Sequence, residues 1–137
     1  MTENSSRPAE DELEAKRKRR FDFKEKVTTK ISDIVRFIGL GLIAVFYTIK
    51  NGAAYKGFSP AQYLILYIVG ISGVISIFLD YIQYNANYYS VDTALKKENL
   101  NYEKESFSYR TAEFAFRWKR HVTTFGAAAL IVLVLLT

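Results

Sequence analysis

The stretch FSPAQYLILYIVGISGVISIFL, residues 58–79, carries no formal charge. An α-helix rises about 1.5 Å per residue, so these roughly 22 residues reach about 30 Å, which is the thickness of the hydrocarbon core of a bilayer. We therefore interpret this stretch as a transmembrane helix. It is the central element of the predicted fold. The other apolar segments are shorter, and each is assessed by whether it is long enough to cross the same bilayer.

Two shorter apolar blocks lie at residues 37–49 and 122–137. The first has only about 13 uncharged residues, so it spans a bilayer only if Arg36 extends its side chain to the surface. The last block becomes long enough when the helix is counted from Trp118. The connection at residues 51–60 is rich in turn residues, which predicts a hairpin of two spans. The predicted fold is an all-α integral membrane protein with three transmembrane helices: a hairpin over residues 37–84 and a third span over residues 121–137.

The N-terminal part is polar and highly charged. Residues 1–20 are expected to be a disordered acidic and basic tail, or a frayed helix, because they contain few side chains that can build a core. Residues 21–36 show apolar side chains at helical spacing, which favours an amphipathic helix in the membrane interface over a stripe that packs into a core. Lipid head groups are expected to contact Lys16, Arg17, Lys18, Arg19, Arg20, Arg36, Lys119 and Arg120.

The distribution of cations predicts the topology. Ten Lys and Arg residues precede the first span and seven lie between the second and third spans, but the connection at residues 50–60 has two. By the positive-inside rule, the N-terminus and residues 85–120 lie in the cytosol and the C-terminus lies outside. We expect a multi-pass protein of a bacterial inner membrane. A net charge of +5 suits anionic lipid, although a basic run can also be an arm that binds nucleic acid, which we do not expect here.

Small residues recur on one face of the central helix, at steps of three and four residues. Such a face allows close packing of membrane helices, either within the chain or between copies of it, and the same face is an alternative candidate for the lining of a pore. The residues proposed for helix packing or for a pore face are Gly39, Gly41, Gly70, Gly73, Ser76, Asp80 and Gly126.

Asp80 is the acidic residue at the end of the central span. An ionisable side chain inside a membrane is a functional candidate by default, but this one lies near the expected cytosolic edge. The structural alternative is a carboxylate that pairs with a nearby cation, for which Arg117, Lys119 and Arg120 are candidates.

The polar segment at residues 85–120 has neither proline nor glycine, so no residue forces a break in helicity. We expect a cytosolic helical hairpin with its turn near residues 98–101. Two stripes at helical spacing are expected to pack against each other, which is a better explanation of these aromatic residues than a nucleic-acid platform. The residues expected in this contact are Tyr84, Tyr88, Leu95, Phe107, Phe114 and Trp118.

The chain has one histidine, no cysteine and no glycine-rich phosphate loop. Catalytic and metal-binding chemistry depends on such groups, so we expect neither an enzyme nor a bound metal or cofactor. The expected partners are anionic lipid, other copies of the chain and a cytosolic protein.

A hairpin of two spans is followed by Asp80, Gln83 and Tyr84 at the exit of the second span, and by Trp118-Lys119 before a terminal span. This order resembles small bacterial three-span inner-membrane proteins, and it is loosely similar to the SLATT-type membrane effectors of antiphage systems, from which the third span departs. The resemblance implies an oligomeric effector that forms a pore or perturbs the membrane under the control of a cytosolic partner. The alternatives are a non-conducting anchor or accessory subunit of a larger complex, and a holin-like lysis protein.

Overall fold

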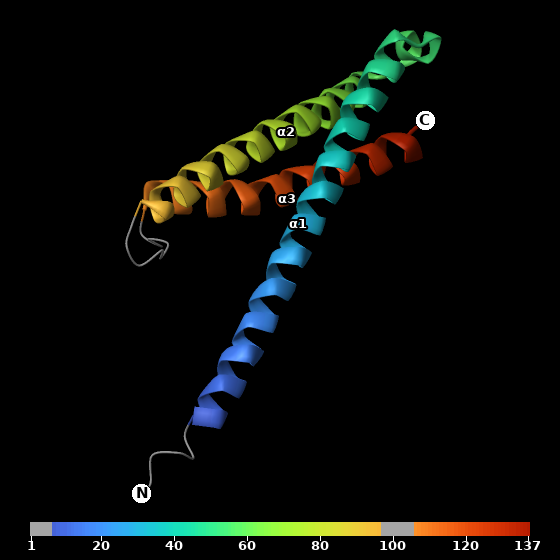
Figure 1. The fold of residues 1–137 in the computed structure, drawn as a ribbon. Coiled ribbons are helices and arrows are strands. Elements are labelled where there is room, and N and C mark those ends of the chain that lie inside the picture. Colours follow the sequence, from blue (N-terminus) through green and yellow to red (C-terminus); the bar gives the residue numbers. More distant parts are fainter. Residues whose placement is uncertain (1–6, 97–105) are drawn as a thin grey trace, which may run out of the picture. The chain divides into compact units, whose positions relative to one another are not determined.

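Helices are the only regular secondary structure in the residues that the computed structural model describes, which are 7–96 and 106–137. The elements are α1 (Arg7–Asn51), a short 3₁₀ helix η1 (Ala53–Gly57), α2 (Pro60–Leu95) and α3 (Phe107–Leu135) (Figure 1). The predicted all-α class is confirmed for these residues. The turn expected near residues 98–101 lies outside them.

The three long helices have the length and composition needed to cross a membrane. In their most apolar windows only 22%, 39% and 22% of the residues, for α1, α2 and α3 in turn, are buried within the chain. In water, so much exposed apolar surface would drive aggregation, whereas in a bilayer it faces lipid. The prediction of three apolar helices of spanning length is therefore confirmed, and the chain has the features of a multi-pass membrane protein.

The chain divides into two units, residues 1–33 and 34–137, so that α1 contributes to both. In the first unit the side chains from residue 10 to residue 27 are exposed, and Lys16 Nζ lies 2.9 Å from a carboxylate oxygen of Glu12, one turn earlier. The helix begins at Arg7, so residues 7–20 follow the helical alternative to the expected disordered tail. No glycine interrupts the sequence before Gly39, and α1 continues past residue 36 without a break.

In the second unit the last part of α1 packs antiparallel to α2 through small residues. An added Cβ at Gly39 would lie 3.2 Å from Ser76 Cβ, and one at Gly73 would lie 2.8 Å from the carbonyl oxygen of Gly39. Farther along, Gly70 accommodates the ring of Phe46 in the same way. The contacting positions advance by three or four residues on α1 as they retreat by three or four on α2, which is the pattern of ridges packed into grooves.

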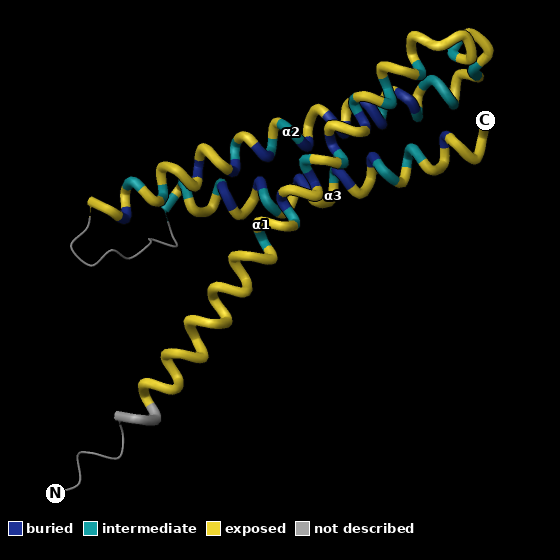
Figure 2. Tube along the Cα trace, turned by 45° about the vertical axis from the view of Figure 1, so that its right-hand side comes forward, coloured by how far each residue is buried: buried dark blue, intermediate teal, exposed yellow. Residues whose placement is uncertain are grey.

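Helices α2 and α3 lie side by side, and their buried positions face each other (Figure 2). Gly126 of α3 leaves room for Ser72 of α2, because an added Cβ would lie 2.6 Å from the Cβ of Ser72. In a bilayer the hydrophobic effect does not drive helices together, so the close contacts made possible by small residues carry the association. The centre of the unit therefore has small residues at the closest helix contacts, with buried aliphatic side chains, Leu42, Leu66, Val69 and Leu133, around them.

Gln62 joins the beginning of α2 to the end of α3. Its Oε1 accepts a hydrogen bond of 2.8 Å from the backbone N–H of Ser59, which completes a capping box at the start of α2. Its Nε2 donates a hydrogen bond of 2.8 Å to the carbonyl oxygen of Leu136, a group that the end of the helix leaves without an intrahelical partner. One amide side chain thus satisfies backbone groups at both helix ends.

Replacing Gln62 by glutamate tests this connection. The carboxylate keeps the acceptor for Ser59 but cannot donate to Leu136, so we expect a loss of about 1 kcal/mol, with fraying confined to the end of α3. The measurement is hydrogen exchange of the amides at residues 132–137, which should become faster in Gln62→Glu, while the amides of the first turn of α2 should exchange as in the wild type. Equal exchange at residues 132–137 in both proteins would show that the connection contributes nothing.

Candidate functional site

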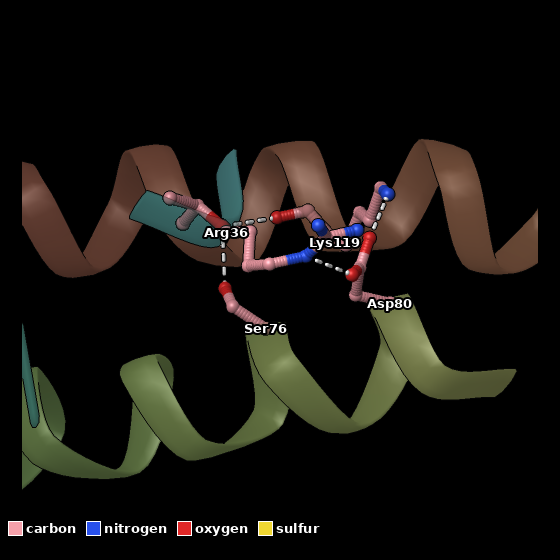
Figure 3. A network of polar contacts seen from close by, with 5 residues as sticks. Arg36, Ser76, Asp80 and Lys119 are labelled. Atoms are coloured by element: carbon pink, nitrogen blue, oxygen red, sulfur yellow. Dashed lines mark hydrogen bonds and ion pairs between the residues drawn. The ribbon is translucent and has the colours of Figure 1, made fainter. Parts of the chain in front are cut away.

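The candidate site is an ion cluster formed by Arg36, Asp80 and Lys119, one residue from each long helix (Figure 3). Arg36 Nε donates a hydrogen bond of 2.8 Å to Asp80 Oδ2, and Lys119 Nζ donates one of 2.5 Å to Asp80 Oδ1. The side chain of Lys119 is fully buried and that of Asp80 is 7% exposed, whereas that of Arg36 is 39% exposed. Asp80 therefore receives a cation on each of its two oxygens.

Hydroxyl and aromatic groups surround the ion cluster. Thr123 donates a hydrogen bond of 2.6 Å to the carbonyl oxygen of Lys119, and its hydroxyl also contacts the hydroxyl of Ser76. The guanidinium carbon of Arg36 lies 5.1 Å from the centre of the Tyr84 ring, which is within the range of a cation–π interaction. The cluster thus continues as a polar seam along the α2–α3 contact.

Gln83 follows Asp80 by one helical turn and is also buried. Among the described residues its Oε1 is a buried side-chain oxygen without a hydrogen-bond partner. The buried polar residues of the seam are Ser72, Ser76, Asp80 and Gln83 on α2, and Lys119 and Thr123 on α3.

The electrostatics of the ion cluster explain why two short apolar blocks can belong to spanning helices. A buried cation without a counter-charge costs several kcal/mol, but Asp80 compensates Lys119 directly and Arg36 in part. The Arg36 side chain is 39% exposed, and its guanidinium also turns to Asp80, so the ion pair accompanies the expected extension of this side chain. Two cations and one carboxylate leave a formal charge of +1 in the cluster.

One of the three cations predicted as candidate partners of Asp80 pairs with it. Lys119 pairs with it, whereas Arg117 forms an ion pair of 2.6 Å with Glu113. Arg120 lies over the ring of Phe116 at 5.7 Å. Arg36 was not among the candidates. Counting residues from the connection does not indicate it, because Arg36 and Asp80 lie 15 and 20 residues from the two ends of that connection.

The small-residue face of α2 is used inside the chain. Gly70, Gly73 and Ser76 all contact α1 or α3, and Gly39 and Gly126 lie on the opposing surfaces. Gly41 differs, because no atom lies within 4 Å of an added Cβ there, which leaves it outside the packing. Of the two alternatives for this face, packing within the chain is the one observed.

The predicted contact between the two aromatic stripes is wrong. We name residues 81–95 of α2 and 107–118 of α3 the arms. Apart from Gln83, their buried positions are alanines, Ala86 and Ala94 on α2 with Ala112 and Ala115 on α3. Alanine allows the two helices to approach closely, so the large side chains are displaced to the outer faces. The exposed residues are those that we expected inside, Tyr84, Tyr88, Leu95, Phe107, Phe114 and Trp118.

The cations expected at lipid head groups fall into two classes. Lys16, Arg17, Lys18, Arg19, Arg20 and Arg120 are exposed, as contact with lipid requires. Lys119 is fully buried against Asp80, which corrects its assignment, and Arg36 is shared between Asp80 and the surface. In the described ranges no group of three His, Cys, Asp or Glu side chains is placed to hold a metal ion.

Comparisons with known proteins add no further assignment: no family model, no curated protein and no solved structure matches this chain.

Proposed function

We propose that the chain is a non-conducting anchor of a bacterial inner membrane, which holds a cytosolic protein at the cytoplasmic face. The N-terminus and the arms lie in the cytosol in this proposal, following the positive-inside rule, and the C-terminus lies outside. The basic run at residues 16–20 and the amphipathic part of α1 then meet anionic head groups.

The observation that carries the proposal is the character of the outward surface. Across residues 37–49, 61–79 and 122–136 the exposed side chains are apolar or aromatic, apart from Thr48 and Thr124. The hydroxyls of these two threonines donate to the carbonyl oxygens one turn earlier in their own helices. A water-filled pore between copies of the chain needs polar groups along its wall, and beside the hydroxyls of Tyr47 and Tyr67 the described part of this surface offers only these two threonines.

The second candidate is an oligomeric membrane-perturbing or pore-forming effector that acts in phage defence and is triggered by a cytosolic partner. The polar seam between α2 and α3 favours it, because a change in the contact of these helices would expose Ser76, Asp80 and Lys119 to a water path. Intramembrane ionisable groups often mark such paths.

Reconstitution of the complex distinguishes the two candidates. The full chain, carrying an affinity tag after Thr137, is purified from its native membrane with whatever it holds and placed in potassium-loaded vesicles. We expect a second polypeptide in a fixed ratio to the chain, and potassium efflux no faster than from protein-free vesicles. Efflux that rises with the amount of complex and falls in the Ser76→Leu variant would overturn the anchor and favour the effector.

A further inference from the structure

The outer face of the α3 arm carries an open groove of about 690 Å³. Three aromatic residues, Phe107, Phe114 and Trp118, line it together with Arg110, Arg117 and Glu113. Phe107 is 86% exposed, and the rings of Phe114 and Trp118 lie 5.8 Å apart. Exposed aromatic residues beside cations are typical of surfaces that bind another macromolecule.

Lipid reaches only one end of this groove. We place the cytosolic boundary of the hydrocarbon core at Trp118. The helical rise along α3 then puts Phe107 about 16 Å and Arg110 about 12 Å outside the core. A tilt of about 40°, the upper end of the usual range, reduces these heights to about 13 and 9 Å. The head-group layer on each side is only about 5–7 Å thick, so these two residues lie above it.

The charges of the groove select the chemistry of an occupant. Arg117 is neutralised by Glu113 at 2.6 Å, whereas Arg110 is exposed and has no ion pair with any residue that the structure describes. On the neighbouring arm of α2, Asp92 is engaged by Lys96 at 2.7 Å. The groove therefore presents aromatic rings together with one positive charge that no described carboxylate pairs with.

We propose that the groove binds an amphipathic segment of a cytosolic protein, whose apolar side chains cover the three rings and whose carboxylate pairs with Arg110. This inference rests on the proposed anchor function, because it places the arms in the cytosol and names the surface that holds the partner. A helix laid along α3 with apolar residues at intervals of three and four positions fits a groove that follows a single helix.

Photocrosslinking in the native membrane tests the inference. A benzoylphenylalanine in place of Phe107 of the full chain should give one protein adduct, with Asp or Glu within about one helical turn, four residues, of the adduct site in the partner. Arg110→Glu should reduce that adduct at least tenfold. The control is Lys56→Glu, a charge reversal at an exposed lysine of η1 that is not part of the groove, which should leave the adduct unchanged. A benzoylphenylalanine at Phe125, which is exposed in the apolar part of α3, should give lipid adducts only.

Every other outcome counts against the groove. A lipid adduct at position 107, an adduct with a second copy of this chain, or a protein adduct that is insensitive to Arg110→Glu would each overturn the inference. If the partner still co-purifies in a fixed ratio but gives no adduct at position 107, the anchor function survives and the groove does not. If no partner co-purifies at all, the anchor function itself fails.

Discussion

Asp80→Asn is expected to destabilise the helical bundle by about 3 kcal/mol or more, because breaking a buried ion pair leaves a buried charge without compensation. The substitution keeps the size of the side chain but leaves the fully buried ammonium of Lys119 without its counter-charge. Thermal unfolding of the protein in one fixed detergent, followed by circular dichroism, measures the loss. The double variant Asp80→Asn/Lys119→Met should be more stable than Asp80→Asn, because it removes the stranded cation.

The chain provides its own control for this experiment. Asp92 and Lys96 form an ion pair of 2.7 Å on one exposed face of α2, and the hydrogen bond to Asp92 raises the pKa of Lys96. Exposed pairs contribute little to stability, so Asp92→Asn should leave the unfolding temperature unchanged. Equal effects of Asp80→Asn and Asp92→Asn would refute the structural role of the ion cluster.

Gly73→Leu should separate α1 from α2. A Cβ at this position already lies 2.8 Å from the carbonyl oxygen of Gly39 and 2.9 Å from Ile43 Cγ1, so the first contact is with backbone, which cannot move aside as a side chain does. Overpacking of a close contact costs about 1–3 kcal/mol, and a leucine here exceeds the available space by several atoms. We expect a drop of many degrees in the unfolding temperature in detergent.

Gly41→Leu is the control for Gly73→Leu, because it makes the same substitution on the partner helix α1. Gly41 lies only two residues from Gly39, the residue that Gly73 contacts. No atom lies within 4 Å of an added Cβ at Gly41, and leucine has the higher helix propensity, so stability should be unchanged or slightly higher. Reduced stability of Gly41→Leu together with unchanged stability of Gly73→Leu would mean that the face of α1 that carries Gly41, and not the small-residue face, makes the contacts that stabilise the bundle.

Much of the fold was predictable because long uncharged stretches have few alternatives to a membrane helix. The turn residues between α1 and α2 and the start of α2 at Pro60 also carry clear local signals. The start of α1 was left open between a disordered tail and a frayed helix, because a polar helix has no apolar period to reveal it. Its helicity depends on the absence of breakers and on pairs such as Glu12 with Lys16.

The site was predictable only in part, because charge pairing depends on how helices are positioned relative to one another. Lys119 was among the candidate partners of Asp80, but Arg36 required the register between α1 and α2. The two aromatic stripes of the arms misled us for a related reason. Helical spacing identifies residues that share a face, but it does not say whether that face or the alanine face beside it is buried. The face that carries Ala86 and Ala115 is buried, because short side chains let the two helices approach closely. The size of the aromatic side chains alone had favoured their burial.

The ion cluster also has a consequence for biosynthesis. During translation the arginine of the first helix leaves the ribosome 44 residues ahead of the aspartate, and the lysine follows that aspartate by 39 residues. The acidic side chain therefore finds a counter-ion as soon as the first two helices meet, before the last one exists. The final helix then brings its ammonium group to a pair for which both partners have already been synthesised.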